Sequence, residues 1–478
     1  MTQPTLAPSL AHTSPAQSSL AERLAEIVGE RHVLSRPSAL LVYNSDGLPG
    51  YRRQPSLAVF PGTREETVAV VRLLADEGLP FVPRGAGTGL SGGALADDIV
   101  VIGLHRLKKI ISFDVENRRA TVEPGVVNLR LNKHVAPHGL LYAPDPSSEA
   151  ACTIGGNVAT NAGGIRVLRY GMYRAQVLGL EAVLADGSVL TSLKGLPKDN
   201  SGYDLSQLFI GAEGTLGVVT RAALRLHPKP VSEVNAFCAL SSLDAAIALL
   251  GLLRQKLGPL LSAYEVNFAP LYDAMVASMD MPAPLPAGSP VYVLAEIQGS
   301  EPERDGERFA EVLMQAVEDG VVDDVVVSQS PREFRALWDV REDANRVLFS
   351  IKGLIGVDIS IPLARMGAFL READAAIHAV DPGADIYVFG HLGDGNLHYQ
   401  VLTVDPAAAY DIVYRGVAAA GGGVSAEHGI GVDKKKWLHL VRSDAEIATM
   451  RRLKAALDPR NILNPGRVFD LNPTAFCR

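Results

Sequence analysis

His391 and His398 lie in the stretch GHLGDGNLHYQ, with an Asp-Gly pair midway between them and apolar runs on both sides. An Asp-Gly pair between such runs predicts a β-hairpin with a two-residue turn. In that register His391 lies directly opposite His398, and the two imidazoles share one face of a sheet with Cβ atoms about 5 Å apart. A histidine pair of this kind can bind a metal ion, or it can simply pack and hydrogen-bond.

Glycine-rich segments are the second candidates for chemistry, because stacked backbone amides can bind phosphate. PRGAGTGLSGGA (residues 83–94) has the G-x-G-x-x-G spacing of a nicotinamide-binding Rossmann fold, but the next segment, DDIVVIGL, predicts a strand where that fold needs a helix. We therefore predict an anion-binding loop, with Arg84 adding charge, outside a Rossmann fold. Two further small-residue segments, 153–164 and 211–220, make a merely flexible loop a poor explanation of all three.

The elements around these motifs divide the chain into two halves. In the first half, residues 57–60 and 80–83 are predicted strands joined by a helix that opens at Thr63 with a capping box, and a hairpin turns later at Asp186-Gly187. After HPKPVSE, predicted strands at VYVLAEI, VDISIPL, IYVFGHL and LHYQVL alternate with amphipathic helices. The sequence therefore predicts an α+β protein whose second half is an antiparallel sheet covered by helices.

The composition is that of an ordinary globular protein. The chain has 478 residues, of which 47% are hydrophobic, which is enough for two or three domains. The net charge of -8 comes from scattered charges, so no nucleic-acid partner is expected. The 3 cysteines form no C-x-x-C pair, which favours a reducing compartment. There is neither an apolar run of roughly 18 residues, as a membrane span requires, nor a signal-peptide pattern, so we expect a cytoplasmic protein without an integral membrane segment.

Six motifs follow one another along both halves of the chain: PRGAGTGLSGGA, PDPSSEAACTIGGNVATNAGG, GAEGTLGVVT, GHLGDGNLHYQ, SAEHGIGVDKK and DPRNILNPGRVF. In this order they resemble the FAD-linked D-2-hydroxyacid dehydrogenases of the vanillyl-alcohol oxidase and p-cresol methylhydroxylase (PCMH) superfamily. The resemblance implies a two-subdomain FAD-binding domain over residues 21–228 and a substrate, or cap, domain over 229–453. Residues 454–478 would return to the FAD domain, and residues 1–20 are predicted to be a disordered tail.

The resemblance also implies which residues bind FAD. The expected set is Arg84, Gly85, Ala86, Gly87, Thr88, Gly89, Leu90, Pro144, Asp145, Ser148, Gly155, Gly156, Asn157, Thr160, Gly163, Gly164, Glu213, Val218 and Asn464. Residues 84–90 would wrap the pyrophosphate. Glu213 and Val218 would bound the adenosine end, and Asn464 would approach the isoalloxazine ring. Thr88 stands where covalently flavinylated members of the superfamily have a histidine, so non-covalent FAD is expected.

The resemblance implies a third metal ligand beside the two histidines. SAEHGIG places Glu427 beside His428 in a glycine-flanked turn, and the family implies that His391, His398 and Glu427 bind a divalent metal. Two imidazoles and a carboxylate with open positions suit zinc, although manganese, iron and cobalt tolerate the same ligands. The implied reaction oxidises a D-2-hydroxy acid to its 2-oxo acid. His428 would take the hydroxyl proton, and the C2 hydride would pass to flavin N5. A solvated loop histidine is the alternative for His428.

Arg341 is the expected anchor for the substrate carboxylate, because the resemblance aligns it with the family's substrate arginine and a guanidinium fork matches a carboxylate. An ion pair on the helix surface is the alternative. Asn345, one turn later, and Gln400 are further expected substrate contacts. Gly356 and Gln400 stand where 2-hydroxyglutarate dehydrogenases tend to have lysine and asparagine, which weakens the case for a dicarboxylate. D-2-hydroxyglutarate and D-lactate are nevertheless the first substrates that the family implies.

No second redox centre is evident in the sequence, so we expect electrons to pass to an external acceptor: a quinone, an electron-transfer flavoprotein or a cytochrome. Three alternatives remain open at this point. The protein could be an oxidase that reduces dioxygen, a flavin subunit of a glycolate oxidase-type complex with a separate iron-sulfur partner, or an NAD-dependent reductase. A homodimer is compatible with the sequence.

Overall fold

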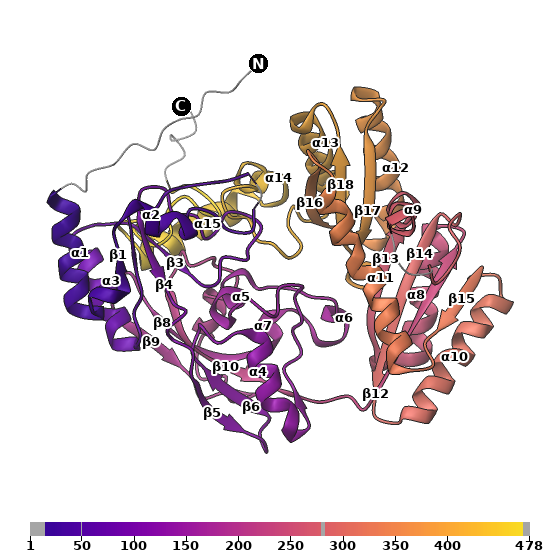
Figure 1. The fold of residues 1–478 in the computed structure, drawn as a ribbon, viewed down its shortest axis with the longest axis horizontal. Coiled ribbons are helices and arrows are strands. Elements are labelled where there is room, and N and C mark those ends of the chain that lie inside the picture. Colours follow the sequence, from indigo (N-terminus) through magenta and orange to yellow (C-terminus); the bar gives the residue numbers. More distant parts are fainter. Residues whose placement is uncertain (1–14, 49, 279–282, 472–478) are drawn as a thin grey trace.

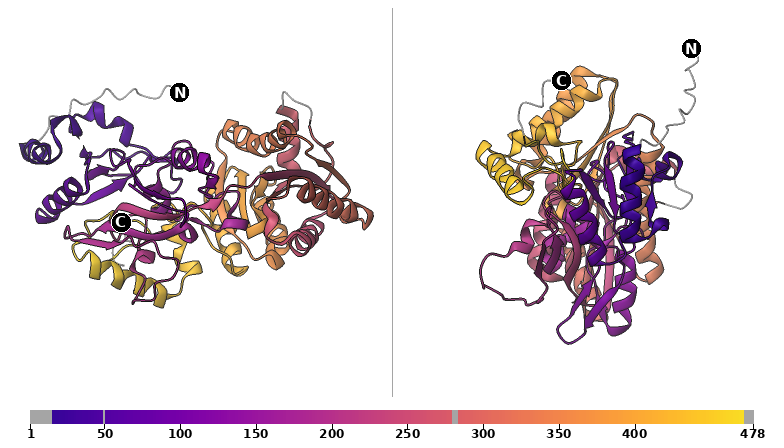
Figure 2. Two further views of the ribbon diagram at one scale, coloured as in Figure 1. Left: turned by 90° about the horizontal axis from the view of Figure 1, so that it is seen from below. Right: turned by 90° about the vertical axis from the view of Figure 1, so that its left-hand side faces the viewer.

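The computed structural model describes residues 15–48, 50–278 and 283–471. The chain forms two lobes that lie side by side (Figures 1 and 2). The tail predicted over residues 1–20 lies outside the described residues up to residue 14, but helix α1 (Pro15–Val28) begins within it, so residues 15–20 are helical rather than disordered. Among the described residues, no helix is long and apolar enough to cross a membrane.

The N-terminal lobe begins with a small mixed sheet. Its strands are β1 (Val33–Leu34), β2 (Leu57–Val59), β4 (Val100–Gly103) and β3 (Phe81–Arg84), in that spatial order. Helix α3 (Arg64–Asp76) connects β2 to β3, and the side chain of Thr63 accepts a hydrogen bond from the backbone N–H of Glu66 at 3.0 Å, which confirms the predicted helix start. Strand β4 follows the first glycine-rich segment and runs parallel to β2 and β3, which confirms that no Rossmann helix begins there.

The second sheet of this lobe is antiparallel. Its strands are β5 (Ile110–Asp114), β6 (Arg119–Val122), β10 (Val218–Arg225), β8 (Val177–Val183) and β9 (Val189–Ser192). Strands β8 and β9 form the hairpin predicted at Asp186-Gly187. The second glycine-rich segment contains a short helix, α5 (Ile154–Thr160). The remaining elements are α2 (Pro37–Leu40), α4 (Asn128–Val135), α6 (Val167–Tyr170), α7 (Tyr173–Gln176) and the pair β7 (Leu140–Leu141) and β11 (His227–Pro228).

The C-terminal lobe is built on a seven-stranded antiparallel sheet, as the sequence predicts. Its order is β15 (Asp324–Val327), β12 (Ser232–Leu240), β14 (Val291–Gly299), β13 (Leu261–Phe268), β17 (Asp385–Gly390), β18 (Asn396–Leu402) and β16 (Ile355–Ser360). The sequence patterns predicted β14, β16, β17 and β18 and missed the other three. The helices are α8 (Leu243–Leu257), α9 (Ala269–Ser278), α10 (Pro302–Glu318), α11 (Pro331–Ser350), α12 (Leu363–Val380) and α13 (Pro406–Ala419).

The two faces of this sheet serve different purposes. Helices α8, α10, α12 and α13 cover one face, whereas α9 and α11 pack on part of the other. Because side chains alternate along a strand, Leu397 and Tyr399 of β18 point into the core under the first face. His398 and Gln400 therefore point to the second face, and Asp358 of β16, which lies opposite His398, shares it. Polar residues thus gather on the face that the helices leave partly open.

The chain returns to the N-terminal lobe through α14 (Leu438–Val441) and α15 (Asp444–Leu457), shown in yellow in Figure 1. Lys454 of α15 donates to the carbonyl of Thr215 at 2.8 Å. The backbone N–H of Asn464 donates to the carbonyl of Phe81 at 2.8 Å, beside strand β3. Both ends of the described chain therefore belong to the same lobe.

Candidate active site

The two histidines of GHLGDGNLHYQ meet, but not in the predicted register. In the β17–β18 hairpin it is Phe389, not His391, that lies opposite His398. The loop spans residues 391–395, between the end of β17 and the start of β18. The predicted two-residue turn needs positive φ at both Asp394 and Gly395, and of these two only Gly395 has it, at 83°. His391 lies beyond the end of β17, and its ring still meets that of His398, with centroids 5.4 Å apart. The direct cross-strand pairing was therefore wrong, although the proximity of the rings was not.

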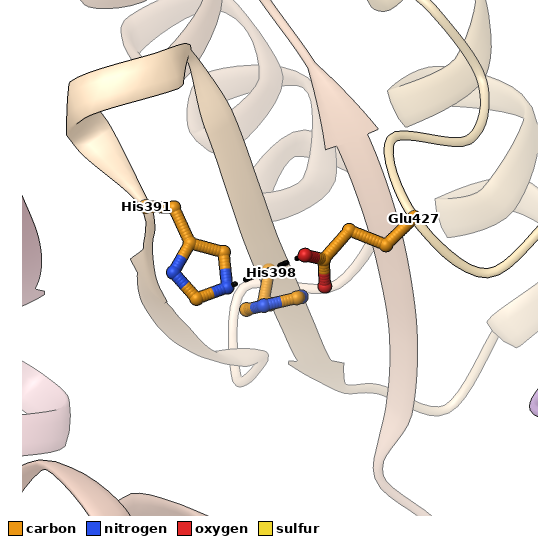
Figure 3. A group of neighbouring side chains, drawn as sticks. All are labelled: His391, His398 and Glu427. Atoms are coloured by element: carbon orange, nitrogen blue, oxygen red, sulfur yellow. Dashed lines mark ion pairs between the residues drawn. The ribbon is translucent and has the colours of Figure 1, made fainter. Parts of the chain in front are cut away.

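His391, His398 and Glu427 form one cluster (Figure 3). Each offers one ligand atom, and these atoms lie within 4.8 Å of one another. Nε2 of His391 is 3.8 Å from a carboxylate oxygen of Glu427. Two imidazoles and one carboxylate are a donor set that suits zinc and that other divalent transition metals accept. The residues present therefore fit a divalent metal ion.

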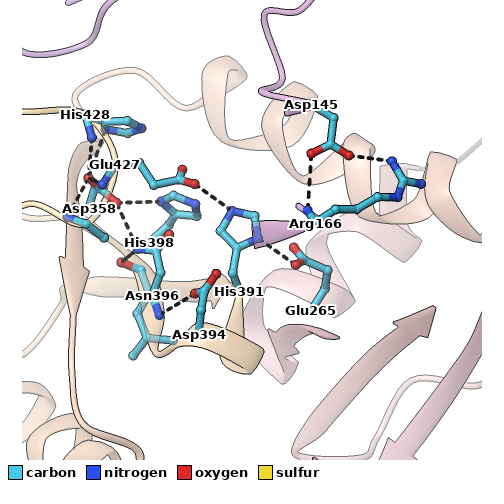
Figure 4. A network of polar contacts seen from close by, with 12 residues as sticks. Asp145, Arg166, Glu265, Asp358, His391, Asp394, Asn396, His398, Glu427 and His428 are labelled. Carbon is cyan, nitrogen blue, oxygen red and sulfur yellow. Dashed lines mark hydrogen bonds and ion pairs between the residues drawn. The ribbon is translucent and has the colours of Figure 1, made fainter. Parts of the chain in front are cut away.

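Glu265 of β13 connects this cluster to Arg341 of α11. Its buried carboxylate accepts a hydrogen bond from Nδ1 of His391 at 2.6 Å and another from Nε of Arg341 at 2.8 Å. The first bond leaves Nε2 of His391 facing Glu427 (Figure 4), an arrangement typical of metal-binding histidines. Arg341 is only 7% exposed, which argues against a surface ion pair. Within the described residues, its two Nη atoms have no hydrogen-bond partner, so they are free to bind an anion.

Asp358 is the main residue of the cluster that the sequence did not predict. One of its carboxylate oxygens accepts three consecutive backbone N–H groups, those of residues 426–428, at 3.2, 2.9 and 3.0 Å. Asp358 therefore fixes the turn that carries Glu427 and His428 (Figure 4). A second possible ligand group combines Asp358 with Glu427 and His428. Because the Asp358 carboxylate is already bound to these N–H groups, the group containing both His391 and His398 is the better metal site.

His428 lies beside the cluster, and its imidazole ring is neutral at pH 7. Its ring stacks on that of His398 with centroids 6.0 Å apart, and its Nδ1 lies 3.7 Å from the Asp358 carboxylate. Burial lowers the pKa of His428 below its ordinary value, although Asp358 opposes this effect. The imidazole is therefore neutral at pH 7 and able to accept a proton. Its side chain is 27% exposed, so it is not the fully solvated loop histidine of the alternative hypothesis.

The protonation state of the Glu427 carboxyl group depends on the charges around it. Burial raises its pKa to about 7, against the opposing effect of His391. For His391, burial alone would lower the pKa, but the carboxylates of Glu265 and Glu427 raise it to about 9. A carboxylate must be ionised to bind a metal, and a positive charge among these side chains stabilises the ionised form of Glu427.

A cavity in the N-terminal lobe is lined by all three glycine-rich segments. The expected FAD-binding residues on its wall are Gly85, Ala86, Gly87, Thr88, Gly89, Gly155, Gly156, Asn157, Thr160 and Glu213. Thr153, which the sequence did not predict, also lines it, and its buried hydroxyl has no hydrogen-bond partner among the described residues. Walls of backbone and a free hydroxyl fit a large polar cofactor such as FAD. His428 lies on the same wall, so the cavity reaches the histidine cluster.

The other expected FAD-binding residues lie outside the wall of this cavity. They are Arg84, Leu90, Pro144, Asp145, Ser148, Gly163, Gly164, Val218 and Asn464. The guanidinium of Arg84 donates to the carbonyls of Ala94 and Ser45. It therefore connects the two ends of the first glycine-rich segment and also binds that segment to residue 45. Val218 points into the core, whereas the next residue of β10, Val219, lines the cavity, because side chains alternate along a strand.

Two of these residues are nevertheless near the cluster or the cavity. Gly163 packs directly against the carboxylate of Glu427, where a larger side chain would collide with it. The side-chain amide of Asn464 donates to the carbonyls of Gly93 and Glu213 at 3.0 and 2.7 Å. Asn464 thus joins the first and third glycine-rich segments.

A buried ion-pair network connects the two lobes. Arg166 of the N-terminal lobe donates to both carboxylate oxygens of Glu296 of β14, at 2.8 and 2.7 Å. It also donates to Asp145 at 2.5 Å (Figure 4). Glu296 is fully buried and also accepts from Nε1 of Trp338 at 2.8 Å. Burial raises the pKa of Asp145 to about 6, although Arg166 opposes this effect. Asp145 therefore takes part in the contact between the lobes.

The remaining expected substrate contacts flank the cluster. Asn345 is half-buried, one turn after Arg341 on α11, and no hydrogen bond connects its side chain to another described residue. Gln400 lies on the same face of β18 as His398, and its side chain covers Gly356, the residue opposite it in β16. Two residues after His398, the same sheet face therefore carries the neutral amide of Gln400.

Family comparisons agree with this architecture. The family model described as "FAD binding domain" matches residues 55–192, and the model described as "FAD linked oxidases, C-terminal domain" matches residues 229–468. A D-2-hydroxyglutarate dehydrogenase of Stutzerimonas stutzeri is 36% identical over 96% of this chain and 99% of its own length. One of Xanthomonas citri pv. viticola is 38% identical over 94% and 96%. Glycolate oxidase subunit GlcD of Bacillus subtilis is 34% identical over 94% and 96%.

Solved structures show the same fold. p-Cresol methylhydroxylase superposes with a TM-score of 0.77 at 18% identity, covering 96% of this chain and 98% of that chain. 4-Ethylphenol oxidase from Gulosibacter chungangensis superposes with a TM-score of 0.74 at 19% identity, covering 97% and 99%. The architecture is therefore that of the PCMH-type flavoproteins. The chain belongs to the FAD-linked oxidase family, and within it to the FAD-dependent D-2-hydroxyacid dehydrogenases.

Proposed function

We propose that this protein oxidises a D-2-hydroxy acid to the 2-oxo acid with non-covalently bound FAD and a divalent metal, most simply zinc, held by His391, His398 and Glu427. The observation that carries the proposal is the meeting of this cluster with the glycine-lined cavity at His428. A substrate bound there would lie between a metal-type donor set and the FAD-binding segments. When bound, FAD supplies a hydride acceptor and the metal supplies Lewis acidity towards the substrate oxygens.

The side chains of the chain itself bind the substrate and move its proton. His428 accepts the hydroxyl proton, because its ring is neutral and lies beside the cluster. Arg341 binds the substrate carboxylate through its unengaged Nη atoms, while Glu265 fixes the guanidinium from the other side. The buried surroundings of Arg341 exclude water and strengthen its contact with the substrate carboxylate.

The relatives suggest D-2-hydroxyglutarate as the substrate, since several of them carry that name. The neutral pair of Gly356 and Gln400 favours D-lactate or another acid without a second carboxylate. Both substrates therefore belong in every assay. The electrons pass to an external acceptor, and we propose a cytoplasmic location, although some relatives are named as mitochondrial proteins.

Removal of the metal tests the proposal directly. Treatment with a strong chelator is expected to abolish turnover of both D-2-hydroxy acids with an artificial dye as acceptor, and added zinc or manganese should restore it, because the donor set binds such ions reversibly. Metal content and bound flavin are measured on the same samples. Full activity in metal-free enzyme would refute the metal site.

The same assay addresses the second candidate function, that of a flavin subunit in a larger complex. The similarity to subunit GlcD of Bacillus subtilis favours this alternative. Turnover by the purified chain alone would argue against a required iron-sulfur partner.

Replacement of Arg341 by lysine tests the carboxylate anchor. A lysine keeps one charge but loses the fork, and it cannot bind Glu265 and the substrate in the same geometry. We expect kcat/KM to fall by roughly 10²-fold for every 2-hydroxy acid, as is usual for the loss of a charge-assisted contact worth 2–3 kcal/mol. Steady-state kinetics across D-lactate and D-2-hydroxyglutarate provide the measurement. A loss restricted to one substrate would instead make Arg341 a specificity residue.

A further inference from the structure

The turn that carries His428 is held by two buried carboxylates, one from each lobe. Asp358 of the C-terminal lobe binds the N–H groups of residues 426–428 on one side. On the other side Glu213, from the third glycine-rich segment, accepts the backbone N–H of Ile430 at 2.7 Å with one oxygen and that of Gly431 at 2.8 Å with the other. His428 is the last residue bound by Asp358, and Gly429 alone separates it from the two amides that Glu213 binds. The position of the turn therefore depends on both lobes.

Glu213 is itself firmly fixed in the N-terminal lobe. Its backbone N–H donates to the carbonyl of Ala159, and its own carbonyl accepts the side-chain amide of Asn464. Its φ is 52°, a left-handed conformation that a non-glycine residue adopts only where the surroundings enforce it. The side chain is buried, and both carboxylate oxygens are used by the turn. This use differs from the adenosine contact that the family resemblance suggests for Glu213.

The turn has almost no freedom next to this carboxylate. Gly429 has a φ of 78°, and a Cβ at this position would lie 2.7 Å from Oε1 of Glu213. The hydroxyl of Ser91, in the first glycine-rich segment, donates to the carbonyl of Gly429 at 3.0 Å. Ser91 and Glu213 both line the FAD cavity. The segments that surround the cavity thus also hold the turn that presents His428.

We propose that Glu213 is a positioning residue for His428: by binding the amides of Ile430 and Gly431, it sets the position of the imidazole on the wall of the FAD cavity. The proposal rests on the proposed role of His428 as the base. Loss of one acceptor oxygen leaves a buried N–H without a partner and allows the turn to move. A displacement of about 1 Å is enough to slow an oriented reaction roughly 10²-fold.

Glu213→Gln is the sharpest test, because glutamine keeps the shape of the side chain but turns one acceptor into an N–H₂ donor that faces a backbone N–H. We expect flavin reduction in single-turnover stopped-flow experiments to slow by on the order of 10²-fold, with substrate Kd, FAD content and metal content unchanged. Amide hydrogen exchange in the peptide that contains residues 428–433 should accelerate, a readout that does not depend on activity.

Glu181→Gln is the matched control. Glu181 is a buried carboxylate of β8 in the same lobe, and it accepts hydrogen bonds from Thr220 at 3.0 Å and Thr191 at 3.2 Å. This variant should leave both the reduction rate and the exchange of residues 428–433 at the wild-type level. If Glu213→Gln does not fold, Gly429→Ala can replace it, because the added Cβ would push the turn away from the Glu213 carboxylate. This variant should also reduce the rate of flavin reduction while substrate Kd and FAD content stay unchanged.

Two outcomes would overturn the inference. One is a wild-type reduction rate in Glu213→Gln, and the other is loss of FAD together with activity, which would indicate a cofactor contact. His428→Gln separates this failure from that of the proposed function: an inactive His428→Gln beside a fully active Glu213→Gln refutes only the positioning role.

Discussion

Replacement of His398 by alanine is expected to reduce kcat/KM for D-2-hydroxy acids by roughly 10³-fold, because the variant loses one of two imidazole donors and with it several kcal/mol of Lewis-acid stabilisation. FAD should remain bound, since His398 lies in the C-terminal lobe and does not line the glycine-rich cavity. The flavin spectrum, the metal content and the rate with a dye acceptor are the measurements. Metal should be lost while the visible flavin absorbance is retained.

His378→Ala is a suitable control for this experiment. His378 lies near the C-terminal end of α12 in the same lobe, and its ring hydrogen-bonds to the carbonyl of Ala384 at 3.1 Å, away from the metal-type cluster. The control should keep both metal and activity. A fully active His398→Ala variant with metal still bound would contradict the ligand assignment.

Replacement of His428 by glutamine is expected to lower kcat by about 10²–10⁴-fold, the usual contribution of a positioned general base. Glutamine fills similar space but cannot accept the hydroxyl proton. Stopped-flow measurement of flavin reduction isolates this step from reoxidation by the external acceptor. Substrate binding should change little, because Arg341 and the metal ligands remain in place.

Free imidazole should partly restore flavin reduction in a variant that lacks the His428 ring. In His428→Gly the ring is replaced by a space next to His398, and added imidazole should restore part of the reduction rate. A rate in His428→Gln equal to that of the wild type would assign the proton transfer to another group.

The alternation of side chains made much of the second half predictable. LHYQVL places Leu397 and Tyr399 on one face of β18 and His398 on the other, and the structure has this division. The capping box at Thr63 and the Asp186-Gly187 hairpin were equally local signals and were confirmed. Patterns of this kind depend only on neighbours within a few residues, so the sequence contains all the information they need.

The hairpin at Asp394-Gly395 shows the limit of local signals. Its dipeptide favours a two-residue turn, but the backbone N–H of Asn396 donates to the carbonyl of His391, which closes a longer loop. Strand β13 also pairs with β17 as far as Gly390, so the neighbouring strand helps to determine where β17 ends. Such tertiary contacts override the preference of the dipeptide.

Contacts between distant segments were the least predictable part of the site. Asp358 and Glu213 hold the His428 turn through backbone N–H groups, which carry no residue-type signal in the sequence. Glu265 reaches His391 and Arg341 from a strand that the patterns did not predict. A buried acidic residue in an apolar run, as in VDISIP or SAYEVNF, is the one clue that could have pointed to two of them.

The Arg166–Glu296 contact limits how the two lobes can be exchanged between related proteins. Glu296 is a buried carboxylate in a strand of mainly apolar residues, and its charge is balanced by a guanidinium from the other lobe. If the C-terminal lobe were joined to a foreign flavin-binding partner, it would carry an uncompensated buried anion, at a cost of about 3–5 kcal/mol. The two lobes are therefore not freely interchangeable modules, and recombination between distant relatives should succeed only when both members of this ion pair are exchanged together.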